Sequence, residues 1–324
     1  MKAIKVSSYG GPDVLKLSDA GPRPAPKAGQ VLVRIHAAGV NFIDIYQRRG
    51  AYPVKLPFIP GLEASGVVEA VGEKAGEFKP GDRVAYAGHM GSYGEYTVIE
   101  ERRLIPLPEE LSFPEGAAFP LQGMTAHYLL HEFREPKPGD TVLIHAAAGG
   151  VGLLLVQWAK RLGAMVIGTV STDEKARAAE GAGADHVILY AKQDFVAETM
   201  RLTAGRGAQL ILDGVGKSTF SGDLEAAAAH GHVVIYGAAS GPADPLAPNS
   251  LMTKSLSVSG GSLVNFTATR EELLRRSRAV LEALKEGWLK LRVDHILPLE
   301  EAERAHRLLE GRQSMGKIIL KVTE

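Results

Sequence analysis

Short buried strands alternate with helices through the middle of the chain, and this alternation limits the possible folds more than any other feature. The apolar runs predict strands at 140–146, 165–171, 186–190, 209–216, 232–238 and 255–261. Helices are predicted between the strands, at 153–163, 173–181, 195–203 and 219–229. Strands joined through helices run parallel, so the pattern indicates an α/β, doubly wound parallel sheet with helices on both faces.

The first ~120 residues have a different texture, which predicts a compact β-rich domain. Apolar runs of period two occur at Gln30–Val40, Ser65–Gly72 and Asp82–Gly88, broken by Gly and Pro clusters. A long helix is expected over 269–289, and a last strand at 316–322 could return to this first domain. With 324 residues, two domains are the natural expectation.

Composition excludes several classes of function. Lys plus Arg and Asp plus Glu both total 37, so no net charge draws the chain to nucleic acid or to an anionic membrane. We expect a small, nearly neutral partner. The chain has no cysteine, which excludes disulfides, a thiolate nucleophile and sulfur-ligated zinc. No long apolar run and no signal-peptide pattern occur, so a cytoplasmic location is expected, away from membranes.

The string HAAAGGVG (His145–Gly152) carries the strongest chemical signal, because it joins a buried strand directly to a helix. Ala147, Gly149 and Gly152 take the three small-residue places of a dinucleotide fingerprint, with alanine in place of the first glycine. Small residues let the backbone and the helix N-terminus approach a pyrophosphate, and a side chain at Gly149 or Gly152 is expected to block that approach.

The end of the second strand of this unit indicates which nicotinamide cofactor is bound. NAD-binding proteins carry an acidic residue there for the ribose diol. Here Ser171 stands at the tip and Lys175 follows, a hydroxyl and a cation that suit the 2′-phosphate of NADPH. Asp173 lies two residues past the tip, and we expect it to be the N-cap of the next helix.

Several blocks, in order, resemble one family along nearly the whole chain. They are GGPDVL (10–15), AAGVNFIDIYQRRGAYP (37–53), PFIPGLEASGVVEAVG (57–72), GDRVAY (81–86), AAFPLQGMTAHYLL (117–130) and HAAAGGVGLLLVQWAKRLGA (145–164). The chain resembles the quinone oxidoreductases of the medium-chain dehydrogenase/reductase superfamily, those similar to zeta-crystallin. The resemblance implies a GroES-like β-rich substrate domain from residues 1–124 and 266–324, with a Rossmann NADPH-binding domain at 125–265 inserted between them.

The resemblance also implies that no metal is needed. Zinc-dependent alcohol dehydrogenases of the same superfamily have a cysteine where this sequence has Asn41 and a histidine where it has Leu62, before Glu63. Without zinc little stabilises the alkoxide of a simple alcohol, whereas a quinone or enone accepts hydride into its own delocalised system. Glu63 is expected to be a structural acid rather than a general base.

By matching position, the resemblance implies a set of site residues. Asn41 and Thr125 are expected near the nicotinamide half of the cofactor, and Gly150 and Val151 against the pyrophosphate. Ser171, Lys175 and Tyr190 are expected around the adenosine phosphate. Tyr46 and Tyr52 are expected on the substrate side, so that Asn41, Tyr46 and Tyr52 form the catalytic set, with the loop Gln47–Pro53 as a wall of the acceptor pocket. The rest of the cofactor cleft is expected to be lined by Gly214, Val215, Gly237, Ala238, Ser240, Ser262, Leu263 and Lys317.

The sequence therefore predicts hydride transfer from NADPH to a quinone or similar conjugated carbonyl in an interdomain cleft. A homodimer is expected, paired through the apolar strand at 255–261. Two alternatives stay open: a reductase of α,β-unsaturated aldehydes or ketones on the same scaffold, and a non-enzymatic nucleotide-binding protein. The intact Asn41 and Tyr52 argue against the second.

Overall fold

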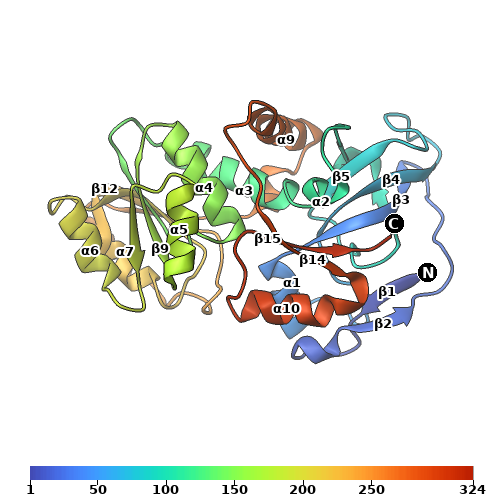
Figure 1. Ribbon diagram of the computed structural model, residues 1–324, viewed down its shortest axis with the longest axis horizontal. Coiled ribbons are helices and arrows are strands. Elements are labelled where there is room, and N and C mark those ends of the chain that lie inside the picture. The colour runs from blue at the N-terminus through green and yellow to red at the C-terminus, as the bar shows by residue number, and fades with distance from the viewer. Residues whose placement is uncertain (324) are drawn as a thin grey trace. The chain divides into compact units, whose positions relative to one another are not determined.

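The computed structural model describes residues 1–323, which cluster into two compact units (Figure 1). The β-rich unit contains residues 1–121, 267–278 and 291 onward, and the parallel-sheet unit contains 122–266 and 279–290. The expected second segment of the β-rich domain, 266–324, thus loses residues 279–290 to the other unit. Reciprocal hydrogen bonds hold this segment: Lys290 N donates to Gln157 Oε1 at 2.8 Å, and Gln157 Nε2 donates to Lys290 O at 3.1 Å.

The β-rich unit is built on one sheet of seven strands, in the order β14-β15-β3-β4-β5-β7 with β6 paired to β3. Its strands are β3 (Gln30–Val40), β4 (Glu63–Val71), β5 (Arg83–Ala87), β6 (Tyr96–Glu100), β7 (Ile105–Pro106), β14 (Val293–Pro298) and β15 (Lys317–Lys321). A separate hairpin pairs β1 (Lys2–Lys5) with β2 (Lys16–Asp19). The last strand does return to this unit, because β15 pairs antiparallel with β3, Ile318 opposite Val40 (Figure 1).

The helices of the β-rich unit are α1 (Phe42–Arg49), α2 (Phe113–Gly116) and α10 (Ala302–Glu310), together with the first part of α9 (Arg270–Lys285). Helix α1 follows β3 directly, with Asn41 as its N-cap and Gly50 as its C-cap, and the φ of 78° at Gly50 suits glycine. The expected loop Gln47–Pro53 is therefore wrong in its first half, where Gln47, Arg48 and Arg49 form the last helical turn.

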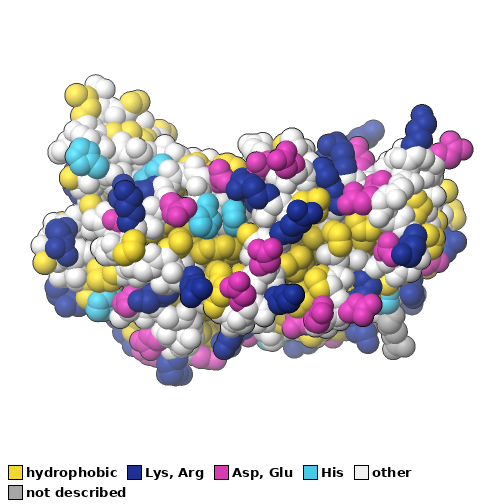
Figure 2. All heavy atoms as spheres, turned by 90° about the horizontal axis from the view of Figure 1, so that it is seen from above, with side chains coloured by type: hydrophobic (Ala, Val, Ile, Leu, Met, Phe, Trp, Pro, Cys, Tyr) yellow, Lys and Arg dark blue, Asp and Glu magenta, His cyan; other side chains and the backbone are white. Residues whose placement is uncertain are grey.

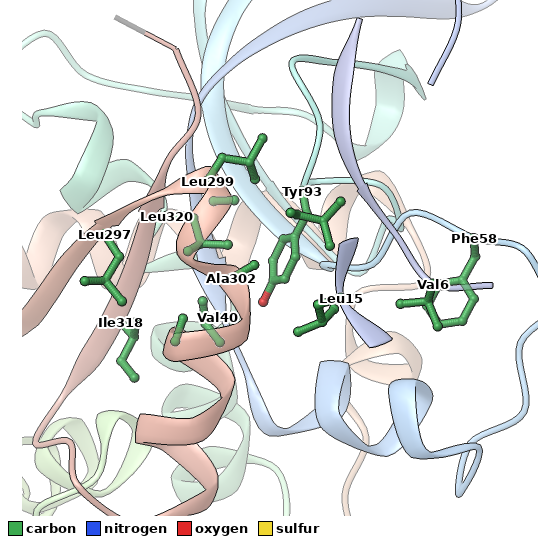
Figure 3. Close-up of a cluster of buried hydrophobic side chains, with 13 residues drawn as sticks. Val6, Leu15, Val40, Phe58, Tyr93, Leu297, Leu299, Ala302, Ile318 and Leu320 are labelled. Atoms are coloured by element: carbon green, nitrogen blue, oxygen red, sulfur yellow. The ribbon is translucent and has the colours of Figure 1, made fainter. Parts of the chain in front are cut away.

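Apolar side chains from both ends of the chain share one core in this unit (Figure 3). Val6 and Leu15 come from the first residues, Val40 from β3, and Leu297 and Ile318 from β14 and β15. Each such side chain contributes roughly 1.5–3 kcal/mol when fully buried. The C-terminal strands are therefore part of the same core as the N-terminal segment, although more than 250 positions separate them in sequence.

The parallel-sheet unit has six strands in the order β10-β9-β8-β11-β12-β13, all parallel. They are β8 (Thr141–Ile144), β9 (Met165–Val170), β10 (His186–Leu189), β11 (Ala208–Asp213), β12 (Ala227–Ile235) and β13 (Ser257–Gly260). The chain leaves β8 toward β9 and β10, then returns to the other side of β8 with β11. This order is the doubly wound Rossmann arrangement that the sequence predicted, and the direction in which successive strands are added across the sheet reverses between β8 and β11.

The helices of this unit are α3 (Pro120–His131), α4 (Gly150–Arg161), α5 (Asp173–Gly181), α6 (Phe195–Leu202), α7 (Phe220–Ala226) and α8 (Leu263–Phe266). Helix α4 begins three residues before its expected start. The helix expected over 219–229 ends at Ala226, because Ala227 already pairs with Ala208 of β11. Alanine favours a helix by propensity alone, and the sheet contact overrides that preference.

Charged side chains of both signs are mixed on the face drawn in Figure 2, where Lys and Arg lie between Asp and Glu. The sequence has equal numbers of acidic and basic residues, and on this face the two kinds are interspersed. No helix described within residues 1–323 is long and apolar enough to cross a membrane.

Candidate functional site

The loops at the carboxyl ends of the six parallel strands hold the predicted cofactor residues of the parallel-sheet unit, with Thr125 in α3 as the exception. Parallel strands end at one edge of their sheet, so these loops share that edge. In chain order, these loops and the first turns of the helices that follow them carry Ala147 to Gly152, then Ser171 and Lys175, Tyr190, Gly214 and Val215, Gly237 to Ser240, and Ser262 with Leu263.

The nucleotide loop turns sharply between β8 and α4. Ala146 has a φ of 51°, and its carbonyl accepts a hydrogen bond from Gly149 N at 2.8 Å. A Cβ added to Gly152 would collide with that same carbonyl, so Gly152 must be small for the helix to pack on its own loop. The loop itself thus requires a small residue here, and the obstruction of a pyrophosphate by a side chain at Gly152 stays a prediction.

The alanine in the first fingerprint place has a structural explanation. Ala147 is fully buried, and its backbone N donates to Thr169 O on β9 at 3.1 Å. Its methyl group occupies the space beside Gly168, where an added Cβ would lie 2.7 Å from Ala147 Cβ. The neighbouring strand thus provides the room that glycine provides in the usual fingerprint.

The N-terminus of α4 fits a pyrophosphate group. The helix begins at Gly150 with Gly149 as its N-cap, and Leu153 N donates to Gly149 O at 2.9 Å. The N–H groups that precede Leu153 in the first turn have no acceptor within the helix, and a helix N-terminus carries the positive end of the dipole. Gly149 is close to nothing but its own loop, since an added Cβ would have one neighbour, Ala146 O at 3.1 Å.

The ends of β9 and β10 form a corner of the sheet edge that contains Ser171, Lys175 and Tyr190. Tyr190 N donates to Val170 O at 3.1 Å, which joins the two loops. The N-cap of α5 is Thr172, whose Oγ1 accepts from Lys175 N at 3.3 Å. The expectation that Asp173 is the N-cap is therefore wrong, because the strand ends one residue earlier than expected and Thr172 takes the cap.

The loops after β11 and β12 are joined by hydrogen bonds. Ser240 N donates to Val215 O at 2.9 Å, and Ser240 Oγ donates to the same oxygen at 2.8 Å. Asp213 holds the first loop by accepting from Val215 N at 2.6 Å. Two loops that the resemblance assigns to the cofactor are thus rigidly connected within this unit.

A row of buried, hydrogen-bonded polar side chains adjoins the nucleotide loop. His145 lies just before the loop, with Nδ1 2.9 Å from Thr169 Oγ1 and Nε2 2.7 Å from Asp223 Oδ1. Burial raises the pKa of Asp223 to about 6. Burial alone would lower the pKa of His145, but its hydrogen bond to Asp223 outweighs this and the pKa is raised. The pair therefore fixes the end of β8 against β9 and α7.

In the β-rich unit, Asn41, Glu63 and Lys317 form one buried cluster. Lys317 Nζ donates to Asn41 Oδ1 at 2.8 Å and forms an ion pair with Glu63 Oε2. Asn41 Nδ2 donates to Glu63 Oε2 at 2.9 Å and to Gly39 O at 3.2 Å. Glu63 Oε1 accepts from Leu121 N at 2.7 Å. The cluster joins β3, β4 and β15 and gives Glu63 a structural contact, while the expectation that Glu63 is not a general base stays a prediction.

A second buried polar chain begins at the same asparagine. Asp44 Oδ2 accepts from Asn41 N at 2.9 Å and from Tyr93 OH at 3.0 Å. Tyr93 OH lies 3.1 Å from His306 Nε2, and Arg48 Nη1 lies 3.1 Å from His306 Nδ1. Burial raises the pKa of Asp44 to about 7, while burial and then Arg48 lower the pKa of His306 to about 3. This chain connects α1 to α10.

Tyr46 and Tyr52 lie together beside α1. Their ring centroids are 5.2 Å apart at an interplanar angle of 61°, and Tyr52 N donates to Tyr46 O at 3.2 Å. Phe42 extends the group, with its centroid 6.2 Å from that of Tyr46. Tyr52 is 51% exposed, so about half of the residue is accessible beside Tyr46. An accessible aromatic ring suits stacking on a flat conjugated molecule.

The sequence matches two family descriptions. "Alcohol dehydrogenase GroES-like domain" matches residues 27–109, and "Zinc-binding dehydrogenase" matches 150–278. A quinone oxidoreductase from Pseudomonas aeruginosa is 41% identical over 323 residues, which is 98% of this chain and 99% of the relative. The chain belongs to the quinone oxidoreductase family of the medium-chain dehydrogenase/reductase superfamily.

Other relatives agree with this assignment to the quinone oxidoreductase family. The structure of Escherichia coli quinone oxidoreductase complexed with NADPH matches with a TM-score of 0.96 at 38% identity, covering 99% of this chain and 100% of that chain. A 2-haloacrylate reductase from a Burkholderia species is 39% identical over 332 residues, 98% of both proteins. The expected α/β fold, GroES-like domain and Rossmann domain are confirmed.

The cluster at Asn41 also bears on metal binding in this quinone oxidoreductase family member. Among residues 1–323, no group of three or more His, Asp or Glu side chains is placed to hold a metal ion. Asn41 and Glu63 instead share the ammonium group of Lys317. Whether activity needs a metal stays a prediction from the sequence.

Three residues near the predicted site were not identified from the sequence. Gln122 lies against Gly150, where an added Cβ would collide with its amide group. Asp44 lies three residues after Asn41, the spacing of an N-cap and its N3 partner, and that spacing could have revealed it. Lys192 pairs with Asp173, and no local pattern announces this contact.

Proposed function

We propose that this protein transfers hydride from NADPH to a quinone or a similar conjugated carbonyl compound. The observation that carries the proposal is the carboxyl edge of the Rossmann sheet, where a small-residue loop, a helix N-terminus and the pair Ser171 and Lys175 follow successive strands. The names of the relatives, quinone oxidoreductases from several organisms, support the class of acceptor.

The parallel-sheet unit binds and orients the cofactor, which supplies the hydride when bound. The first turn of α4 binds the pyrophosphate through backbone N–H groups, with Gly150 and Val151 in contact. Ser171, Lys175 and Tyr190 bind the 2′-phosphate, because a hydroxyl and an ammonium group favour it and a carboxylate would oppose it. Together these contacts fix the cofactor along the sheet edge.

The β-rich unit orients Asn41 for one kind of contact. The ammonium group of Lys317 requires an acceptor, so it faces Asn41 Oδ1, and the amide nitrogen then donates to Glu63 and Gly39. Both donors of the side chain are thus committed. With both donors in use, Asn41 meets the nicotinamide ribose or carboxamide only through Oδ1, as a hydrogen-bond acceptor.

Tyr52 and Tyr46 provide the surface for the acceptor. A quinone stacks on the accessible ring of Tyr52, whose edge contact with Tyr46 holds the ring in place. A quinone spreads the incoming charge over its own conjugated system, so the protein's part is to position the acceptor and exclude water.

The test measures NADPH oxidation with and without a series of quinones, with NADH as the matched cofactor control. We expect an acceptor-dependent rate that is faster with NADPH. Binding of NADPH without any acceptor-dependent rate would instead favour a nucleotide-binding protein that does not catalyse the reaction.

A second candidate is the reduction of a carbon–carbon double bond conjugated to a carbonyl. The 39% identity to a 2-haloacrylate reductase favours it, because that relative is named for a conjugated acid. Steady-state turnover of a quinone, an alkenal and 2-chloroacrylate by one preparation separates the two candidates. A kcat/KM for either unsaturated compound above that for every quinone would make this second reaction the main one.

We further propose that the protein works in the cytoplasm as a homodimer and without a metal. Strand β13 is the last strand of its sheet, and the exposed apolar side chains of Met252 and Val264 lie in the segments on either side of it. An edge of this kind favours pairing with a second copy. Light scattering at micromolar concentration tests the dimer, and activity after chelation tests the metal; a monomer or zinc-dependent activity contradicts the respective proposal.

A further inference from the structure

We infer that Lys192 is a specificity-determining residue, which favours NADPH over NADH by neutralising the carboxylate of Asp173. The inference rests on the proposed function, because it needs the 2′-phosphate to bind at Ser171 and Lys175. Two acidic residues in this stretch depart from the NADPH pattern, Asp173 and Glu174, and Asp173 is the nearer to Ser171 in the sequence. It lies three positions beyond Val170, the last residue of β9.

The structure places a cation directly against this carboxylate. Lys192 Nζ lies 3.2 Å from Asp173 Oδ2 and 3.5 Å from Oδ1. The two residues follow the ends of neighbouring strands, since β9 and β10 pair in parallel with Leu189 opposite Val170. The loops that follow these strands contain Ser171 and Tyr190, so the ion pair lies in the same corner as the proposed phosphate contacts.

Both partners are held in place by their backbones. Lys192 N and Gln193 N donate to Leu189 O at 2.8 and 2.9 Å, and Gln193 Oε1 accepts from Leu189 N at 3.0 Å. Thr172 caps α5, which fixes Asp173 as the first residue of the helix. The pairing of the two side chains therefore follows from the turn after β10 and the cap before α5.

The ion pair adds little to the stability of the fold. The Lys192 and Asp173 side chains are 64% and 66% exposed, and exposed pairs contribute about 0–1 kcal/mol. The ion pair matters more for cofactor binding than for folding. An unpaired carboxylate at Asp173 would repel the dianion of the 2′-phosphate of NADPH and would not repel the neutral ribose hydroxyl of NADH. Lys192 cancels this repulsion.

The experiment measures dissociation constants of NADPH and NADH by titration calorimetry, without an acceptor. Lys192→Ala should weaken NADPH binding on the order of tenfold and change NADH binding less than about twofold. In Lys192→Ala combined with Asp173→Asn, NADPH binding should return to within about threefold of the wild type. Lys160→Ala is the control, because Lys160 forms a partly exposed pair with Asp185, 2.8 Å away, just before the amino end of β10. It should leave both constants unchanged.

Two results would overturn the inference: no loss of NADPH affinity in Lys192→Ala, or a loss that the added Asp173→Asn does not restore. The second result would mean that Lys192 acts on the phosphate itself and not through Asp173. A wild-type protein that binds NADPH no more tightly than NADH would instead refute the proposed 2′-phosphate site. The failure of the inference and the failure of the proposed function are thus told apart by the wild-type constants.

Discussion

Replacing Lys317 by methionine should destabilise the β-rich unit strongly, because it leaves a buried carboxylate without its cation. Lys317 is 1% exposed and Glu63 is 0% exposed. In Lys317→Met, Glu63 keeps its hydrogen bonds from Leu121 N and Asn41 Nδ2 and loses its charge partner. Breaking a buried ion pair on one side costs about 3–5 kcal/mol. For a unit of this size, that loss lowers the unfolding midpoint by about 6–20 °C.

Differential scanning calorimetry measures this change, and Lys321→Met is the matched control. Lys321 lies on the same strand and is exposed, so its replacement should leave the midpoint nearly unchanged. The double variant Lys317→Met with Glu63→Gln removes both charges and should recover most of the lost stability. The reasoning is refuted if Lys317→Met melts with the control, or if the double variant is no more stable than the single one.

Three further predictions concern the cofactor, the acceptor and pH. Lys175→Glu should weaken NADPH binding by on the order of 2 kcal/mol more than NADH binding, and equal losses in a titration would place Lys175 elsewhere. Tyr52→Ala should raise the KM for a bulky quinone while Tyr52→Phe stays nearly silent; wild-type kinetics in Tyr52→Ala would remove Tyr52 from the acceptor pocket. Burial raises the pKa of Asp44 from 3.8 to about 7, so between about pH 4 and 7 the unfolded chain releases a proton that the folded chain keeps, and stability falls as pH rises. In Asp44→Asn, the free energy of unfolding should fall by roughly 2–4 kcal/mol less over this pH range than in the wild type. Denaturant midpoints measured as a function of pH test this, and parallel curves for the two proteins would contradict it.

Local patterns in the sequence predicted the elements that such patterns control. Strand β3 and helix α5 begin and end at the expected residues, because an apolar period of two and a helix between a strand and a glycine-rich turn are local signals. Strand β14, with Asp294 and His295 among its six residues, was not predicted. Its pairing with β15 supplies the order that its own composition does not indicate.

The site shows the same division between local and distant information. The residues of the nucleotide loop follow from one string of eight letters, and the structure sets them on the expected edge of the sheet. The ion pair of Lys317 with Glu63 joins positions 254 residues apart, and no period or spacing within either segment points to it. A resemblance named both residues, and only the packing of β15 between β14 and β3 shows why each is there.

The contact between Ala147 and Gly168 suggests a rule for finding and redesigning such loops. The methyl group of Ala147 and the missing side chain of Gly168 share one small volume between two adjacent strand ends. A motif search that insists on glycine in the first place would therefore overlook chains in which the neighbouring strand supplies the space. Moving the methyl group across, by Ala147→Gly with Gly168→Ala, conserves the total volume, and conserved volume is what close-packed interiors tolerate best. The two positions can accordingly be treated as one exchangeable unit when a Rossmann loop is transplanted into another scaffold.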